Sequence, residues 1–373
     1  MTSATTIAAA CALDTITEAR KPTMPDIEST RIDPESTHMY REAGEAANAV
    51  RAQYASNHSR ALELGSKLRS LAPRAVVTCA RGSSDHAATF AKYLIETRLG
   101  VLTSSSAPSV TSVYGVKQDL HGCLFLAISQ SGRSPDLVAA TKAAKAAGAT
   151  VVALVNTDNA PLADVADHLL PLCAGPEQSV AATKSYIASL SAIVHLTAAW
   201  TGDNILLDAL VSAPEALEQA WQLDWGAAMP TLRNTSHLYV IGRGVGLGIA
   251  QEAALKCKET CRLHAEAFSG AEVRHGPQAL LQSNFPALIF TQDDESRADL
   301  ESLARDLVAR DVNVMIAGRP LPGATVLPTV QAHPVIQPLL LAQSFYKLAN
   351  ALAVARGCDP DRPPHLRKIT ETR

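Results

Sequence analysis

Two serine-rich segments in the first half of the chain have the composition of an anion-binding site. Residues 81–84 (Arg-Gly-Ser-Ser) and 129–134 (Ser-Gln-Ser-Gly-Arg-Ser) each follow an apolar run and precede a helical pattern. Backbone N–H groups at a helix start, together with hydroxyl groups, can hold a phosphate. One such turn alone is more often an ordinary helix cap. Because two of them follow neighbouring strands, we predict a single phosphate pocket with hydroxyl groups from Ser83, Ser84, Ser129, Ser131 and Ser134.

Residues in the second half of the chain could move protons. Lys256 and Glu259 are three positions apart in a strong helical pattern, so they share a face. A carboxylate can carry a proton between adjacent carbon atoms, and an ammonium can stabilise the charge that develops. His275 lies in a Gly-Pro turn, and an imidazole is a common proton donor and acceptor in catalysis. Lys368 lies in a proline-rich tail that could close over a pocket. An exposed ion pair and a solvated tail remain the alternatives.

The elements that must position these residues occur twice. Apolar runs at 75–79, 124–128 and 151–155 alternate with helical patterns, which is typical of a parallel sheet covered on both faces. The same order returns 162 residues later, where Arg243 corresponds to Arg81 and Gln292 to Gln130. We therefore predict an α/β fold with two tandem domains, each a parallel sheet flanked by helices. The predicted boundaries are a disordered leader at 1–36, domains at 37–205 and 215–358, and a lid-like tail at 359–373.

The second copy differs at the predicted phosphate segment. Its counterparts of Ser131 and Gly132 are Asp293 and Asp294, and two carboxylates would repel a phosphate. We therefore expect one phosphate pocket per chain, in the first domain, while the second domain supplies catalytic groups.

Composition argues against several classes of protein. The chain has 373 residues and a formal net charge of -3, which disfavours partners held by bulk charge, such as nucleic acid or a membrane surface. Seven scattered cysteines suggest a reducing compartment, so we predict a cytoplasmic protein. The glycines at 242–248 do not complete a dinucleotide-binding fingerprint, and Cys257, Cys261 and His264 have no evident fourth ligand. We predict neither a cofactor nor a metal.

On these motifs, the chain resembles the isomerase domain of glutamine–fructose-6-phosphate aminotransferase. It resembles even more the stand-alone glucosamine-6-phosphate deaminases, which consist of two sugar isomerase (SIS) domains. The similarity extends from about Met39 to the end of the chain. The matching segments, in chain order, are residues 81–84, 128–132, 175–177, 180–184, 253–259, 264–267, 275–277 and the tail to Lys368.

The resemblance implies roles for the matching residues. It implies that Glu259 shuttles a proton between C1 and C2 of a sugar phosphate, with Lys256 as its charge-balancing partner. It implies that His275 opens the sugar ring from the other subunit of a homodimer, and that Lys368 belongs to the closing tail. Two positions depart from the aminotransferase, which has cysteine at Arg81 and serine at Ala182. The implied substrate-binding residues are Ser83, Ser84, Ser129, Gln130, Ser131, Ser134, Glu177 and Val180.

The expected reaction follows from a domain of the aminotransferase to which the resemblance does not extend. The aminotransferase has a glutaminase domain that starts with a cysteine nucleophile, whereas here Thr2 follows Met1. We therefore expect deamination of an amino-sugar phosphate: glucosamine 6-phosphate would give fructose 6-phosphate and ammonia, with no cofactor. The alternatives are a phosphosugar isomerase, a galactosamine-6-phosphate deaminase, a fructosamine-6-phosphate deglycase and, from a different class, a non-catalytic sugar-phosphate sensor.

Overall fold

The computed structural model describes residues 32–157 and 159–368. The predicted leader therefore lies outside the described residues up to position 31. Its last five residues, 32–36, were expected to be disordered but belong to the folded unit. They include the 3-10 helix Pro34–Ser36, and the carbonyl of Pro34 accepts a hydrogen bond from Asn350 Nδ2 at 2.7 Å.

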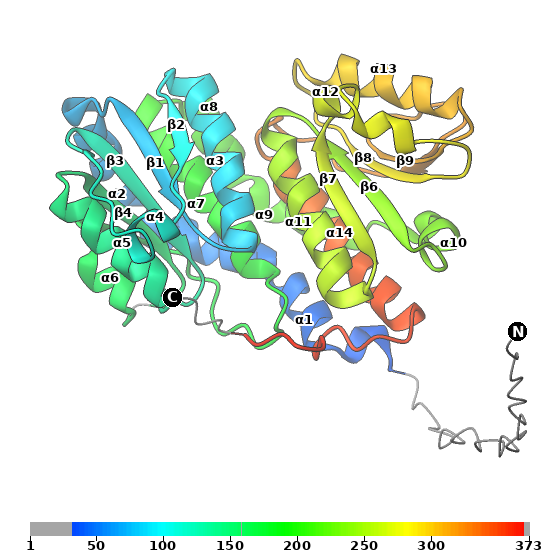
Figure 1. Ribbon diagram of the computed structural model, residues 1–373, viewed down its shortest axis with the longest axis horizontal. Helices are drawn as coiled ribbons and strands as arrows, with labels where there is room; N and C mark the ends of the chain where they lie inside the picture. Colours follow the sequence, from blue (N-terminus) through cyan, green and yellow to red (C-terminus); the bar gives the residue numbers. More distant parts are fainter. Residues whose placement is uncertain (1–31, 158, 369–373) are drawn as a thin grey trace, which may run out of the picture. The chain divides into compact units, whose positions relative to one another are not determined.

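The first sheet contains five parallel strands in the order β2-β1-β3-β4-β5 (Figure 1). The central strand β3 is buried along its whole length, as its continuous apolar run predicts. Successive side chains of a strand point to opposite faces. On β3, Leu124 and Leu126 accordingly join one core cluster, while Phe125 and Ala127 join another. The strands are β1 Ala75–Cys79, β2 Thr103–Ser105, β3 Cys123–Ser129, β4 Thr150–Val155 and β5 His168–Pro171.

The second sheet repeats this topology with the order β10-β9-β8-β6-β7, again with every pairing parallel. In both sheets the first strand pairs with the second on one side and with the third on the other. The predicted duplication of an α/β domain is confirmed. The strands are β6 His237–Gly242, β7 His264–Ser269, β8 Pro286–Phe290, β9 Asn313–Ala317 and β10 Thr325–Leu327.

Helices cover both faces of each sheet, and one core cluster contains residues from both domains. Helix α7 is buried on nearly every side, and most of its apolar residues belong to this cluster. In the first domain the helices are α1 His38–Gly44, α2 Ala46–Leu71, α3 Ser83–Leu99, α4 Ser109–Ser112, α5 Pro135–Ala146, α6 Pro161–Val165 and α7 Lys184–Thr201.

Between the two domains in chain order lie the helices α8 Asn204–Val211 and α9 Ala213–Gln222. The second domain contains α10 Met229–Leu232, α11 Leu247–Cys261, α12 Gly270–Val273, α13 Arg297–Val308 and α14 Gln337–Ala355, with short 3-10 helices at Gly226–Ala228, Gly244–Gly246 and Pro277–Leu280. Over residues 32–157 and 159–368, no helix has the length and hydrophobicity needed to cross a membrane.

Strand order determines where a ligand can bind. In an open parallel sheet, a crevice forms at the carboxyl ends of the strands where the connections change direction. In the first sheet this point lies between β1 and β3, since β2 pairs with one side of β1 and β3 with the other. The two serine-rich segments follow β1 and β3, so the fold places both at this crevice.

Candidate active site

A pocket of about 360 Å³ opens at this crevice. Both serine-rich segments line it, and Glu259 from the second domain and Lys368 from the tail line it as well. Val180 completes the set of predicted residues at its wall. The predicted residues from the two segments that line the pocket are Ser83, Ser84, Ser129, Gln130, Ser131 and Ser134.

The segment after β3 forms a tight turn that leaves donors for an anion. Ser129 Oγ accepts a hydrogen bond from the Gly132 N–H at 3.0 Å, and Ser131 Oγ accepts one from the Arg133 N–H at 3.3 Å. Both hydroxyl protons therefore remain available for a ligand. Gly132 has φ +62°, and a Cβ there would lie 2.6 Å from Ala160 Cβ, so both the backbone and the space require glycine.

The segment after β1 differs from its predicted form. The helical pattern was expected to follow residues 81–84, but α3 begins at Ser83, so Ser83 and Ser84 occupy its first turn. Ser83 Oγ donates to Glu252 Oε1 at 3.2 Å and accepts from Lys256 Nζ at 3.1 Å. Because a hydroxyl has one proton to donate, the proton of Ser83 Oγ is used in the bond to Glu252. Ser83 thus lines the pocket and connects it to helix α11 of the second domain.

Lys256 lies at the centre of a buried group of charges. Its side chain is 1% exposed, and Nζ lies 2.6 Å from Glu259 Oε2 and 3.3 Å from Glu252 Oε1. Burial by itself would lower the pKa of Lys256, but the two carboxylates outweigh burial and raise it. Lys256 therefore stays an ammonium. Glu259 is 22% exposed and lines the pocket, so its carboxylate can reach a ligand while Lys256 holds it in place.

Sequence reasoning missed Glu252, the second carboxylate of this group. Glu252 accepts hydrogen bonds from Ser83 and from Tyr346 Oη at 3.0 Å, and His86 Nδ1 lies 3.0 Å from its Oε2. Burial would raise the pKa of Glu252, but Lys256 and the hydrogen bond with His86 lower it. Glu252 could have been predicted from the sequence as a neighbour of Lys256, because it precedes Lys256 by four residues and so shares its helix face.

Lys368 anchors the tail at the pocket through Glu177. Its Nζ donates to Glu177 Oε2 at 2.9 Å and to the Ser179 carbonyl at 2.7 Å. Glu177 does not line the pocket; its buried carboxylate also accepts from Ser185 Oγ at 2.6 Å. Burial would raise the pKa of Glu177, but Lys368 and these hydrogen bonds lower it. In this structure Glu177 holds the tail lysine, and its implied contact with a substrate remains a prediction.

The tail is attached at a second point, to helix α1. Both carboxylate oxygens of Asp361 accept hydrogen bonds there, from the N–H groups of His38 at 2.7 Å and Met39 at 2.8 Å. These N–H groups begin a helix and have no partner within it. The described part of the tail is therefore attached to the first domain at two points.

Within one chain, His275 does not reach this pocket. It is exposed in the turn after α12, and it is not among the residues that line the pocket. Its predicted role from a second subunit remains a prediction.

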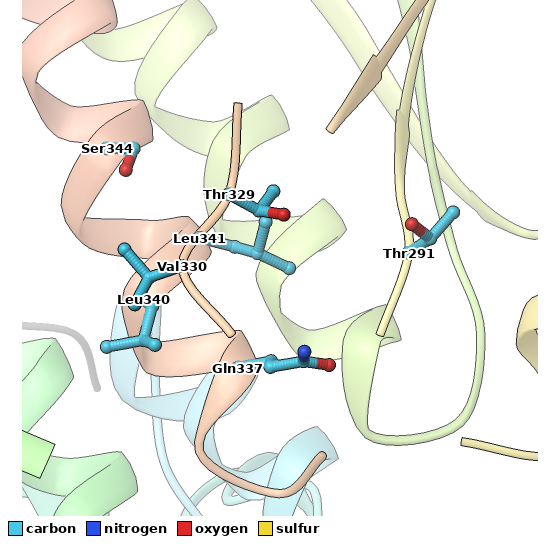
Figure 2. Close-up of a pocket in the computed structure, with 7 residues that line it drawn as sticks. All are labelled: Thr291, Thr329, Val330, Gln337, Leu340, Leu341 and Ser344. Atoms are coloured by element: carbon cyan, nitrogen blue, oxygen red, sulfur yellow. The ribbon is translucent and has the colours of Figure 1, made fainter. Parts of the chain in front are cut away.

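The corresponding region of the second domain is filled by its own side chains. Gln292 Nε2 donates to the Arg243 carbonyl at 2.8 Å and to Asp294 Oδ2 at 2.9 Å. Asp293 is paired with Arg297 and Arg319. Figure 2 shows the adjoining pocket between α14 and the end of β8, with Gln337 at its edge; at about 10 Å³ it has room for one water molecule. This arrangement agrees with the expectation that the phosphate site lies in the first domain.

Comparison with known proteins identifies the family. The SIS domain model matches residues 72–199 and 231–317, which together make up more than half of the chain. The chain belongs to the SIS domain family.

Relatives of this SIS protein include solved structures and curated proteins. A candidate phosphosugar isomerase from Silicibacter pomeroyi DSS-3 is 41% identical, with a TM-score of 0.84 over 87% of this chain and 100% of that chain. The C-terminal domain of glucosamine-fructose-6-phosphate aminotransferase from Francisella tularensis is 25% identical, with a TM-score of 0.79 over 88% of this chain and 98% of that chain.

Glutamine--fructose-6-phosphate aminotransferase [isomerizing] from Thermotoga maritima is 33% identical over 316 residues, which is 79% of this chain and 50% of that protein. The SIS protein thus spans about half the length of the curated relatives it matches. The resemblance to the isomerase domain of this aminotransferase is confirmed.

Proposed function

We propose that this SIS protein is a phosphosugar-converting enzyme that deaminates glucosamine 6-phosphate to fructose 6-phosphate and ammonia. The observation that carries the proposal is the position of Glu259, whose carboxylate lines the same pocket as the hydroxyl-rich segments after β1 and β3. A phosphate held at those helix starts fixes one end of the sugar. The other end of an open-chain sugar can then extend toward Glu259.

The proposed reaction uses the chain's own groups. After ring opening, the Glu259 carboxylate removes the C2 proton and Lys256 stabilises the negative charge that develops. Return of that proton to C1 converts the resulting enolamine into an imine at C2. Water adds to the imine carbon, the C–N bond breaks, and ammonia leaves, so that fructose 6-phosphate remains. His275 of a second subunit is proposed to open the ring.

The relatives support this choice of substrate class. The similar proteins from Francisella tularensis and Thermotoga maritima are named for an aminotransferase of fructose 6-phosphate. The similar structure from Silicibacter pomeroyi is described as a candidate phosphosugar isomerase. The carboxylate and the buried ammonium beside the pocket favour an enzyme over a non-catalytic sensor, because binding alone does not need them.

The experiment is to measure ammonia and fructose 6-phosphate released by the purified protein from glucosamine 6-phosphate. We expect equal amounts of both products. Galactosamine 6-phosphate, fructosamine 6-phosphate and unsubstituted aldose phosphates are tested in parallel. Faster release from one of the other amines would reassign the substrate. Interconversion of aldose and ketose phosphates without ammonia release would indicate an isomerase, and binding without turnover would indicate a sensor; each contradicts the proposal.

A further inference from the structure

Arg81 connects the two hydroxyl-rich segments through a buried carboxylate. Its Nε and Nη2 both donate to Asp136 Oδ2, at 3.1 and 2.8 Å. Asp136 lies in the first turn of α5, directly after the segment 129–134, and its side chain is 0% exposed. The ion pair therefore fixes the end of β1 against the start of α5, which are the two sides of the pocket.

The charges of this pair matter for an anionic ligand. A buried carboxylate beside the pocket would by itself repel a phosphate dianion. The Arg81 guanidinium neutralises that carboxylate, and its side chain is 51% exposed and lines the pocket. A guanidinium has more donors than the two used here, and its planar fork suits phosphate oxygens. Arg81 can thus serve Asp136 and a ligand at the same time.

Arg133 is a useful contrast, because it belongs to the segment 129–134 but does not line the pocket. Its side chain is exposed and its Nη2 donates to the Asn159 carbonyl at 3.4 Å. The two arginines carry the same charge near the same loop, so a comparison between them separates direct contact from general attraction.

We propose that Arg81 is a substrate-binding residue that holds the phosphate of the sugar phosphate and, through Asp136, positions both segments around it. The inference rests on the proposed function in so far as that function assigns this pocket to a phosphosugar. In this proposal Arg81 sets the preference of the pocket for a doubly charged phosphate ester.

The experiment measures binding of sorbitol 6-phosphate by calorimetry, since this open-chain sugar phosphate has no carbonyl or amine to react. Arg81→Gln should weaken binding roughly 10- to 100-fold, the usual loss for a charged hydrogen bond. Arg81→Lys should recover part of it, while Arg133→Gln should bind as the unmodified protein does. Unchanged binding by Arg81→Gln, equal weakening by Arg133→Gln, or no binding by the unmodified protein would overturn the proposal.

A second variant covers the case in which Arg81→Gln unfolds because the buried carboxylate of Asp136 loses its ion pair with Arg81. Arg81→Gln/Asp136→Asn removes both charges and should restore the melting temperature, yet still bind weakly. Full recovery of binding by this double variant would show that Arg81 only holds the two segments in place and does not bind the phosphate. The proposed function can fail while the role of Arg81 holds. In that case sorbitol 6-phosphate binding would depend on Arg81, but the protein would release no ammonia from any amino-sugar phosphate.

Discussion

Glu252 and Glu259 face the same buried ammonium but have different access to the pocket. Glu252 is 1% exposed and is also bonded to Ser83 and Tyr346, whereas Glu259 is 22% exposed and lines the pocket. Only Glu259 can therefore exchange a proton with a ligand. Glu252 is a positioning residue, because it fixes Lys256 and the start of α3 relative to each other.

Lys256→Met should destabilise the protein, because it leaves two carboxylates together without the ammonium between them. The expected loss in the free energy of unfolding is about 3–5 kcal/mol, typical of breaking a buried ion pair, measured by urea denaturation. Lys258→Met is the matched control on the same helix, since Lys258 is exposed and its Nζ donates to the Ala265 carbonyl. An equally large loss in the control would contradict this account of Lys256.

The sequence predicted part of this site. Lys256 and Glu259 follow from helical spacing, and the serines follow from their place after strands. The bond between Ser83 and Glu252 could not be predicted in the same way, because it joins residues 169 positions apart on α3 and α11. Which hydroxyl faces a ligand and which faces a neighbouring helix depends on how these two helices pack.

Close packing between helices explains why glycine occurs at positions that have no role in the reaction. Gly65 of α2 lies against α7, and a Cβ there would be 2.4 Å from the backbone of Ala199. The chain from His38 to Leu71 forms two helices, α1 and α2, with a break at Glu45. Gly44 beside the break packs against Trp221 of α9. That contact is tertiary, so helical periodicity could not reveal it.

Gly65→Ala should lower the free energy of unfolding by about 1–3 kcal/mol, because overpacking outweighs the roughly 1 kcal/mol gained in helix propensity. Ser66→Ala, at the exposed neighbouring position, makes a similar change without the contact and should be close to neutral. Urea denaturation of both variants tests the prediction. A more stable Gly65→Ala protein would show that α2 and α7 are further apart than described.

The same helix pair should make stability depend on pH. His195 of α7 is 2% exposed, stacks on Tyr54 and lies 3.3 Å from His58. Burial lowers the pKa of His195 to about 4. The unfolded chain takes up a proton at this residue near pH 6.5, whereas the folded protein does so only near pH 4. Its contribution to stability is therefore complete above pH 6.5 and is lost as the pH falls toward 4.

The expected loss from His195 over this range is about 3 kcal/mol. Urea denaturation from pH 7 to pH 4 should show a shallower decline for His195→Gln than for the unmodified protein. Parallel declines for the two proteins would refute the assignment to His195.

The duplication of the domain could be predicted from the sequence. The different roles of the two domains could be predicted only in part. The offset of 162 residues predicted two domains, and both sheets have the same strand order. The carboxylates Asp293 and Asp294 correctly indicated that the second copy differs. The tail could not be placed from sequence, because its position depends on Asp361 at the start of α1 and on Lys368 at Glu177.

A homodimer with His275 acting across the interface makes a quantitative prediction. Glu259→Gln and His275→Ala chains should each be inactive, and mixing them after reversible dissociation should give heterodimers in which one of the two sites is intact. Random pairing then restores roughly a quarter of the unmodified activity. If His275 acts within its own chain, both sites of every heterodimer carry a defect and no activity returns.

The most direct test of the central claim is the rate of ammonia release from glucosamine 6-phosphate by Glu259→Gln beside the unmodified protein, at substrate concentrations that saturate both. Because the amide cannot act as a base, we expect Glu259→Gln to lower the rate at least about 100-fold. A variant that releases ammonia at nearly the unmodified rate would contradict the assignment of Glu259 as the group that moves the proton.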